Sequence, residues 1–195
     1  MVKHLEIMLD GPGIVFFDPF VLDAFVKEKG ITKSDLFQLF IDEPIVGDEA
    51  IRQGIILPIY TIPPIDYQII INNSSTSAVR PDWVRLTTPP FPLAIGSSGR
   101  LVGADIYSIM NWDASFYQKL PMDGPKAPQV AAEIPSSKYS VTIKGFVERN
   151  YTGRGPKNIG YELLFEKVEK LPFLPQKADV ESVDFVLWQP GQDSA

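Results

Sequence analysis

Apolar and polar residues alternate along much of the chain, in short stretches that glycines and prolines separate. The clearest example is 139–144, where Tyr139, Val141 and Ile143 alternate with three polar residues. Successive side chains of a strand point to opposite faces, so this alternation predicts a central strand with one buried face. About ten stretches of this kind predict strands, at 4–9, 13–17, 55–62, 67–72, 82–88, 91–95, 105–109, 139–144, 161–165 and 183–187.

Many short strands with turn signals between them are typical of sandwiches and barrels. We therefore expect a mainly β fold, an antiparallel β-sandwich with one or two short N-terminal helices. Pro58 and Pro92 fall inside two of the predicted strands. Because proline has no N–H to give to a ladder, both strands are expected at sheet edges or bulges.

Helix signals are concentrated near the N-terminus. Asp18 followed by Pro19 is typical of an N-cap and a first helical position, and Gly30 is a typical stop. Thr32 or Ser34 is expected to cap a second short helix that ends at Asp42. We interpret 18–42 as helical decoration of one domain that spans 1–195, since one domain of this length is common. The Pro-rich segment 122–135 is interpreted as a loop insertion, and 171–195 as a C-terminal extension.

Charge is distributed unevenly along the chain. The first fifty residues contain four lysines and ten acidic residues, a balance of −6, whereas the remainder contains fourteen residues of each sign. An acidic surface favours basic partners, and a chain with a pI near 4.8 lacks the positive footprint that direct binding of nucleic acid requires. The densest acidic positions are Asp42, Glu43, Asp48 and Glu49.

Large apolar residues are interspersed with these four acids. Apolar anchors among carboxylates would suit binding to a basic protein groove, so we predict these four acids as partner contacts, with Phe40 as an apolar anchor. The alternative interpretation is a solvated helix end and loop, which is what a run of charges usually is.

The composition excludes most common catalytic arrangements. There is no cysteine and the one histidine is His4, so neither a Cys–His nor a thiolate zinc site can form, and a Ser–His pair lacks support. We expect no cofactor, no metal and no enzyme activity. Carboxylates could still act in pairs, in hydrolysis or in cation binding, and those in or beside predicted strands are Asp105, Asp113, Glu148 and Glu162.

A carbohydrate- or small-ligand-binding sandwich is therefore the alternative function, with carboxylate-based hydrolysis as an extension of it. Trp112, Tyr107 and Tyr117 would line its concave face, and Asp105 or Asp113 would orient the ligand. The compartment is inferred from absences: there is no signal-like segment, and the longest apolar stretch is far below the ~20 residues that a membrane span needs. We expect a cytoplasmic protein that does not bind membranes.

Between residues 47 and 168 the order of features resembles the ComJ-type family, inhibitors of a competence DNA-entry nuclease. The similar segments are an acidic opening turn, a strand ending in Asn72-Asn73-Ser74-Ser75, an aliphatic hairpin, a glycine turn leading to Ile106-Tyr107-Ser108-Ile109, and two late strands. In this sequence they are 48–54, 69–75, the hairpin around Pro90-Phe91, 99–109, 138–143 and 161–165.

The resemblance implies a β-sandwich that acts by blocking a nuclease. The chain departs from the family pattern in its longer N-terminal region, in 122–135 and in its C-terminal residues. The sequence thus favours an inhibitor or immunity-type protein whose acidic patch blocks a basic partner, such as a nuclease or a toxin.

Overall fold

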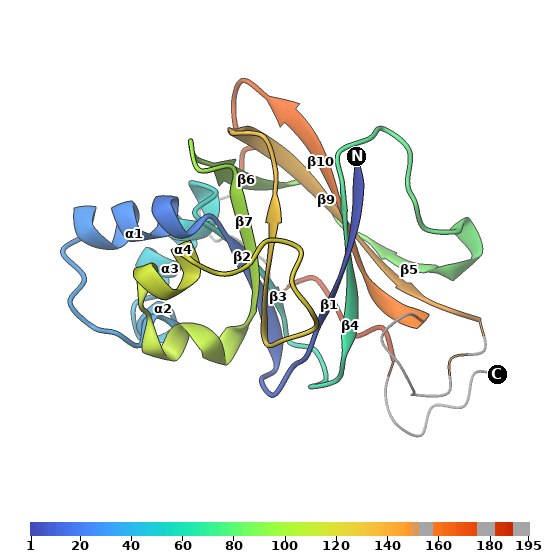
Figure 1. Ribbon diagram of the computed structural model, residues 1–195, viewed down its shortest axis with the longest axis horizontal. Helices are drawn as coiled ribbons and strands as arrows, with labels where there is room; N and C mark the ends of the chain where they lie inside the picture. Colours follow the sequence, from blue (N-terminus) through green and yellow to red (C-terminus); the bar gives the residue numbers. More distant parts are fainter. Residues whose placement is uncertain (150, 152–157, 175–181, 189–195) are drawn as a thin grey trace.

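Two β-sheets form the framework of the protein. The structure, a computed structural model, describes residues 1–149, 151, 158–174 and 182–188. Within these residues the larger sheet has six strands and the smaller has four (Figure 1). The larger runs in the order β1 (Val2–Ile7), β4 (Tyr67–Asn72), β10 (Ile159–Val168) and β9 (Ser137–Val147), with β5 (Val84–Thr87) and β6 (Phe91–Ile95) both paired to β9. The smaller runs in the order β3 (Ile56–Tyr60), β2 (Gly13–Phe17), β7 (Arg100–Asp105) and β8 (Gln129–Glu133).

The strand with the clearest alternation in sequence, β9, lies in the interior of the larger sheet. β9 pairs with β10 on one side and with β5 and β6 on the other. Tyr139, Val141 and Ile143 are buried, and the three polar residues between and after them are half-buried. The predicted register of this strand is therefore confirmed. Pro58 in β3 and Pro92 in β6 lie in edge strands, also as expected.

The prediction of a purely antiparallel sandwich is wrong in two respects. β4 and β10 pair in parallel, whereas each pairs antiparallel with its other neighbour, β1 and β9 respectively. The fold is therefore a mixed two-sheet fold, β-rich but with helices that are not only N-terminal. Most buried apolar side chains of both sheets belong to one hydrophobic core, whereas Ile70 of β4 and Phe146 of β9 form a second, smaller cluster with Val79.

The two helices predicted near the N-terminus are α1 (Pro19–Glu28) and α2 (Leu36–Asp42). Asp18 caps α1 by accepting the Phe20 N–H at 2.8 Å, whereas α2 is capped by Asp35, which accepts the Gln38 N–H at 2.8 Å. The described residues also contain α3 (Pro44–Arg52), α4 (Ala114–Gln118) and two 3₁₀ helices, η1 (Pro81–Trp83) and η2 (Ile106–Asn111). Figure 1 shows α1 to α4 gathered at one end of the molecule. None of the described helices is long and apolar enough to cross a membrane.

Three predicted segments differ from the structure. Residues 105–109 do not continue a strand, because the Asp105 carboxylate accepts the Tyr107 N–H at 2.8 Å and starts η2. The segment 122–135, interpreted as a loop insertion, contains β8, which pairs with β7. Residues 183–187 form no strand, although the Phe185 side chain is fully buried in the core. The rest of the predicted C-terminal extension, 175–181 and 189–195, lies outside the described residues.

Buried tyrosines predict a loss of stability at high pH. Burial raises the pKa of Tyr67 and of Tyr161, and it raises the pKa of Tyr117 to about 12. The folded protein thus holds these phenol protons more tightly than the unfolded chain does. The free energy of unfolding should be unaffected below the unfolded pKa of about 10 and should fall as pH rises above it through the folded values. Urea unfolding at increasing pH measures this, and Tyr117→Phe should reduce the dependence; an unchanged midpoint above pH ~10 would contradict it.

Candidate functional site

The α2–α3 corner, residues 41–45, is the exposed turn at which α2 ends and α3 begins. Pro44 occupies the first turn of α3, and a residue that precedes proline is disfavoured in helical conformation, so the chain breaks at Glu43. The two helices approach closely because Gly47 has no side chain: a Cβ there would lie 3.1 Å from the Phe40 carbonyl oxygen. The residues of the corner are therefore exposed at the surface of the helical end of the fold.

Two large apolar side chains are exposed at this corner. Ile45 is 79% exposed and Ile41 is 51% exposed. The buried residues of α2 include Leu36 and Leu39, three positions apart on one face, and Ile41 does not continue that spacing. Asp42 and Glu43 lie between the two isoleucines and are also exposed. The corner thus presents isoleucines and carboxylates together.

The surrounding segment is strongly acidic. Residues 35–53 contain five acids and one arginine, which gives a balance of −4. Glu49 is engaged within the fold, because its Oε1 lies 2.6 Å from Lys29 Nζ and accepts from Gln53 Nε2 at 2.8 Å. Glu43 lies at a longer distance, 3.9 Å, from Lys33 Nζ. The Asp42 carboxylate accepts from Gln38 Nε2 at 2.8 Å.

The predicted partner residues thus lie on one helical hairpin but differ in exposure. Asp42 and Glu43 are at its exposed turn, whereas Asp48 and Glu49 are half-buried along α3. Phe40 is half-buried and packs against the core. The exposed apolar side chains are instead Ile41 and Ile45. In the sequence, the helical spacing of Ile41 relative to Leu36 and Leu39 was the signal that could have indicated its exposure. The role of these residues in binding stays a prediction.

Two of the predicted ligand-binding or catalytic carboxylates have structural roles instead. Asp105 is buried and accepts three backbone N–H groups, from Asp10 at 2.6 Å, Gly11 at 2.8 Å and Tyr107 at 2.8 Å. Glu162 is also buried, and Asn72 Nδ2 and the Ala78 N–H donate to it at 2.7 Å and 2.6 Å. Neither carboxylate is accessible to a substrate. Among the described residues, no group of three or more potential ligands is placed to hold a metal ion.

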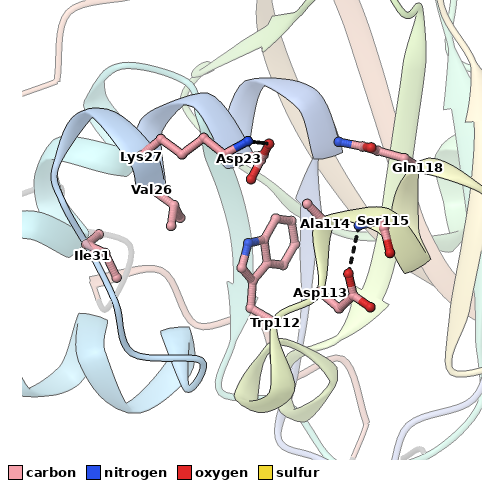
Figure 2. A pocket seen from close by; sticks show the side chains of 9 residues that line it. All are labelled: Asp23, Val26, Lys27, Ile31, Trp112, Asp113, Ala114, Ser115 and Gln118. Carbon is pink, nitrogen blue, oxygen red and sulfur yellow. Dashed lines mark hydrogen bonds and ion pairs between the residues drawn. The ribbon is translucent and has the colours of Figure 1, made fainter.

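A cleft between α1 and α4 brings together two other residues of the predicted ligand set, Trp112 and Asp113 (Figure 2). This α1–α4 cleft is open to solvent and has a volume of about 530 Å³. Tyr107 is not among its lining residues; its ring packs edge-on against Phe37 with centroids 5.7 Å apart. The cleft is lined by Asp23, Val26, Lys27, Ile31, Trp112, Asp113, Ala114, Ser115 and Gln118.

The position of Trp112 in this cleft is fixed by other aromatic rings. Its indole stacks on Tyr117 at 5.2 Å and meets the edge of Phe17 at 5.6 Å. Tyr117 is fixed in turn, because its hydroxyl donates to the Ser108 carbonyl oxygen at 2.6 Å. The structure therefore contradicts the prediction that Tyr117 lines an exposed ligand face.

Charged groups lie on both sides of the tryptophan. Asp113 caps α4 by accepting the Ser115 N–H at 2.9 Å, and the Ser115 hydroxyl and N–H hold the pKa of Asp113 below its usual range. Across the cleft, Lys27 Nζ lies 2.7 Å from Asp23 Oδ2, one helical turn away on α1. The cleft thus contains two carboxylates, one ammonium and one indole.

Comparison with known proteins gives a likeness of structure without a family assignment. No family model and no curated protein matches the sequence. The structure of a protein titled "Crocagin biosynthetic gene J" matches with a TM-score of 0.46 and 15% identity. The structure of ComJ from Bacillus subtilis, an inhibitor of the DNA-degrading activity of NucA, matches with a TM-score of 0.46 and 11% identity. Each match covers 86% of this chain and 99% of the other chain.

The resemblance to ComJ-type proteins that the sequence indicated is thus confirmed as a structural match over most of the chain. At this degree of similarity, a function for this chain has to be derived from its own surface.

Proposed function

We propose that this protein binds a basic protein, such as a nuclease or a toxin, through its α2–α3 corner and blocks that partner's groove. The observation that carries the proposal is the exposure of Ile45 and Ile41 on either side of exposed Asp42 and Glu43. A large aliphatic side chain left in water is unfavourable by about 1.5–3 kcal/mol relative to its buried state. Covering it supplies free energy for association.

The carboxylates of the corner determine which class of partner it suits. Grooves that bind nucleic acid are positive because they neutralise phosphates, and carboxylates can occupy the same positions. Complementary charge raises association rate and specificity more than it raises affinity, whereas buried apolar anchors supply affinity. A corner with both kinds of side chain therefore suits inhibition of a nucleic-acid-binding protein.

The test compares two variants that each remove two negative charges and one exposed large apolar side chain. The first is Asp42→Asn, Glu43→Gln and Ile45→Ser at the corner. The control is Glu166→Gln, Glu169→Gln and Phe173→Ser, three exposed residues at and after the end of β10. Inhibition of nucleic-acid cleavage is measured for NucA and for a panel of purified basic nucleases and basic nuclease toxins.

We expect the wild-type protein to inhibit at least one basic member of the panel. The corner variant should bind it at least about 30-fold more weakly, which corresponds to the loss of one hot-spot side chain at about 2 kcal/mol. The control variant should inhibit as the wild type does. Raising salt from about 50 to 500 mM should weaken binding, because the interacting charges are exposed. Equal loss in both variants, binding that is indifferent to salt, or inhibition of no basic member would refute the proposal.

A further inference from the structure

We propose that the α1–α4 cleft receives an arginine side chain of the basic partner. This inference rests on the proposed function and names a second contact of the same interface. The cleft lies between α1 and α4, and Figure 1 shows these helices at the same end of the molecule as α2 and α3. The segment 31–34 connects the cleft to the α2–α3 corner. Ile31 lines the cleft, the Ser34 carbonyl oxygen accepts the backbone N–H of Trp112 at 2.8 Å, and Lys33 lies near Glu43.

The indole of Trp112 provides a prepared surface for a guanidinium group. Its packing against Tyr117 and Phe17 fixes the ring before anything binds, so little conformational entropy is lost on association. Because Tyr117 stacks on one face, the cleft is lined by the rest of the indole, with Val26 and Ile31 as apolar walls (Figure 2). An arginine has the matching parts, an aliphatic stem and a planar cation that stacks on aromatic faces.

The net charge of the cleft favours the binding of a single positive charge. Its titratable side chains are Asp23, Asp113 and Lys27, which give a balance of −1. Asp113 is exposed, and it stays ionised because its pKa is lowered by the hydrogen bonds of Ser115. The Lys27 side chain is 75% exposed, so its ammonium can leave Asp23 at little cost, since exposed ion pairs within a helix contribute little to stability. A guanidinium that enters beside the indole can then pair with a cleft carboxylate, Asp23 or Asp113.

The test uses the full chain labelled with ¹⁵N and short peptides as probes. The three tryptophans give separate indole N–H signals, and the signal of Trp112 is identified as the one lost in Trp112→Phe. The probes are Gly-Arg-Gly amide, the same peptide with neutral citrulline, the same peptide with lysine, and maltotriose. Trp83 is an internal control, because Arg80 already lies 5.3 Å from its ring.

We expect the arginine peptide to shift the Trp112 signal at millimolar concentration, the lysine peptide to act more weakly and the citrulline peptide to have no effect. Asp113→Asn should weaken the arginine peptide about two- to fivefold, as loss of one exposed charge pair does. The variant should remain folded, because asparagine caps helices as well as aspartate. Lys27→Gln should change affinity in the opposite direction and tighten binding.

Other results would overturn the arginine assignment. Equal shifts from arginine and citrulline peptides would show that charge plays no part, and a shift with maltotriose alone would make the cleft a carbohydrate site. Absence of any shift at Trp112 would leave the cleft without a cation-binding role. Because this titration needs no partner protein, its failure is distinguishable from failure of the corner variant to lose inhibition.

Discussion

Replacing Ile143 with alanine should lower the free energy of unfolding by about 2–5 kcal/mol, the range for large-to-small changes in a core. Ile143 has no exposed surface and lies in β9, opposite Leu163 of β10. Its own N–H donates to Thr88 Oγ1 at 3.0 Å, which fixes the backbone at this point. A strand held on both sides cannot move inward to fill the space that three carbon atoms leave. Urea unfolding followed by circular dichroism measures the loss.

The matched comparison neutralises Asp42, Glu43, Asp48 and Glu49 together as amides. The change in unfolding free energy should be about 1 kcal/mol or less, because exposed pairs contribute about 0–1 kcal/mol each and loss of four like charges relieves repulsion. If the quadruple variant unfolds while Ile143→Ala is silent, both the core assignment and the proposed binding surface are wrong.

Local periodicity explains which parts of the fold could be predicted from the sequence. The alternation in β9 and β10 and the cap at Asp18 depend on residues within a few positions, so these elements were predicted correctly. The parallel pairing of β4 with β10 could not be predicted, because it depends on which distant strand reaches the free side of β4. α3 was missed because its first turn follows a break that resembles a loop in sequence.

In the candidate site, too, features that depend on neighbouring residues could be predicted, and those that depend on distant residues could not. Acid density along the chain indicated the α2–α3 corner, since charge can be counted without a fold. The exposed apolar residue there is Ile45 and not Phe40, which packs inward, and that distinction depends on helix packing. Asp105 looked available for chemistry because its donors are distant: Asp10 and Gly11 lie 95 and 94 positions away.

Glu162 gives the second large effect that we expect. This carboxylate is fully buried, and among the described residues it has no ion pair; neutral donors satisfy it instead. Oε1 accepts from Asn72 Nδ2 and from the Ala78 N–H, and Oε2 accepts from the Ser77 hydroxyl. Since Asn72 is in β4 and Glu162 is in β10, the carboxylate fixes the segment 73–79 to the sheet.

Glu162→Ala should therefore destabilise the protein by about 2–6 kcal/mol, because Asn72 Nδ2 and the Ala78 N–H lose their acceptor at about 1–3 kcal/mol each. Glu162→Gln should cost only about 1 kcal/mol. Its amide oxygen can accept at the Oε1 position from both donors, and its amide nitrogen can donate to Ser77, whose hydroxyl lies 3.5 Å from the Val79 carbonyl oxygen.

Hydrogen exchange at the Ala78 N–H separates these two variants from a general loss of stability. In Glu162→Ala this amide should exchange much faster than the amides of β9, because its acceptor is absent while the sheet remains intact. In Glu162→Gln it should stay protected. If both variants were equally destabilised with the Ala78 amide still protected, the negative charge itself and not its hydrogen-bond geometry would hold the segment in place.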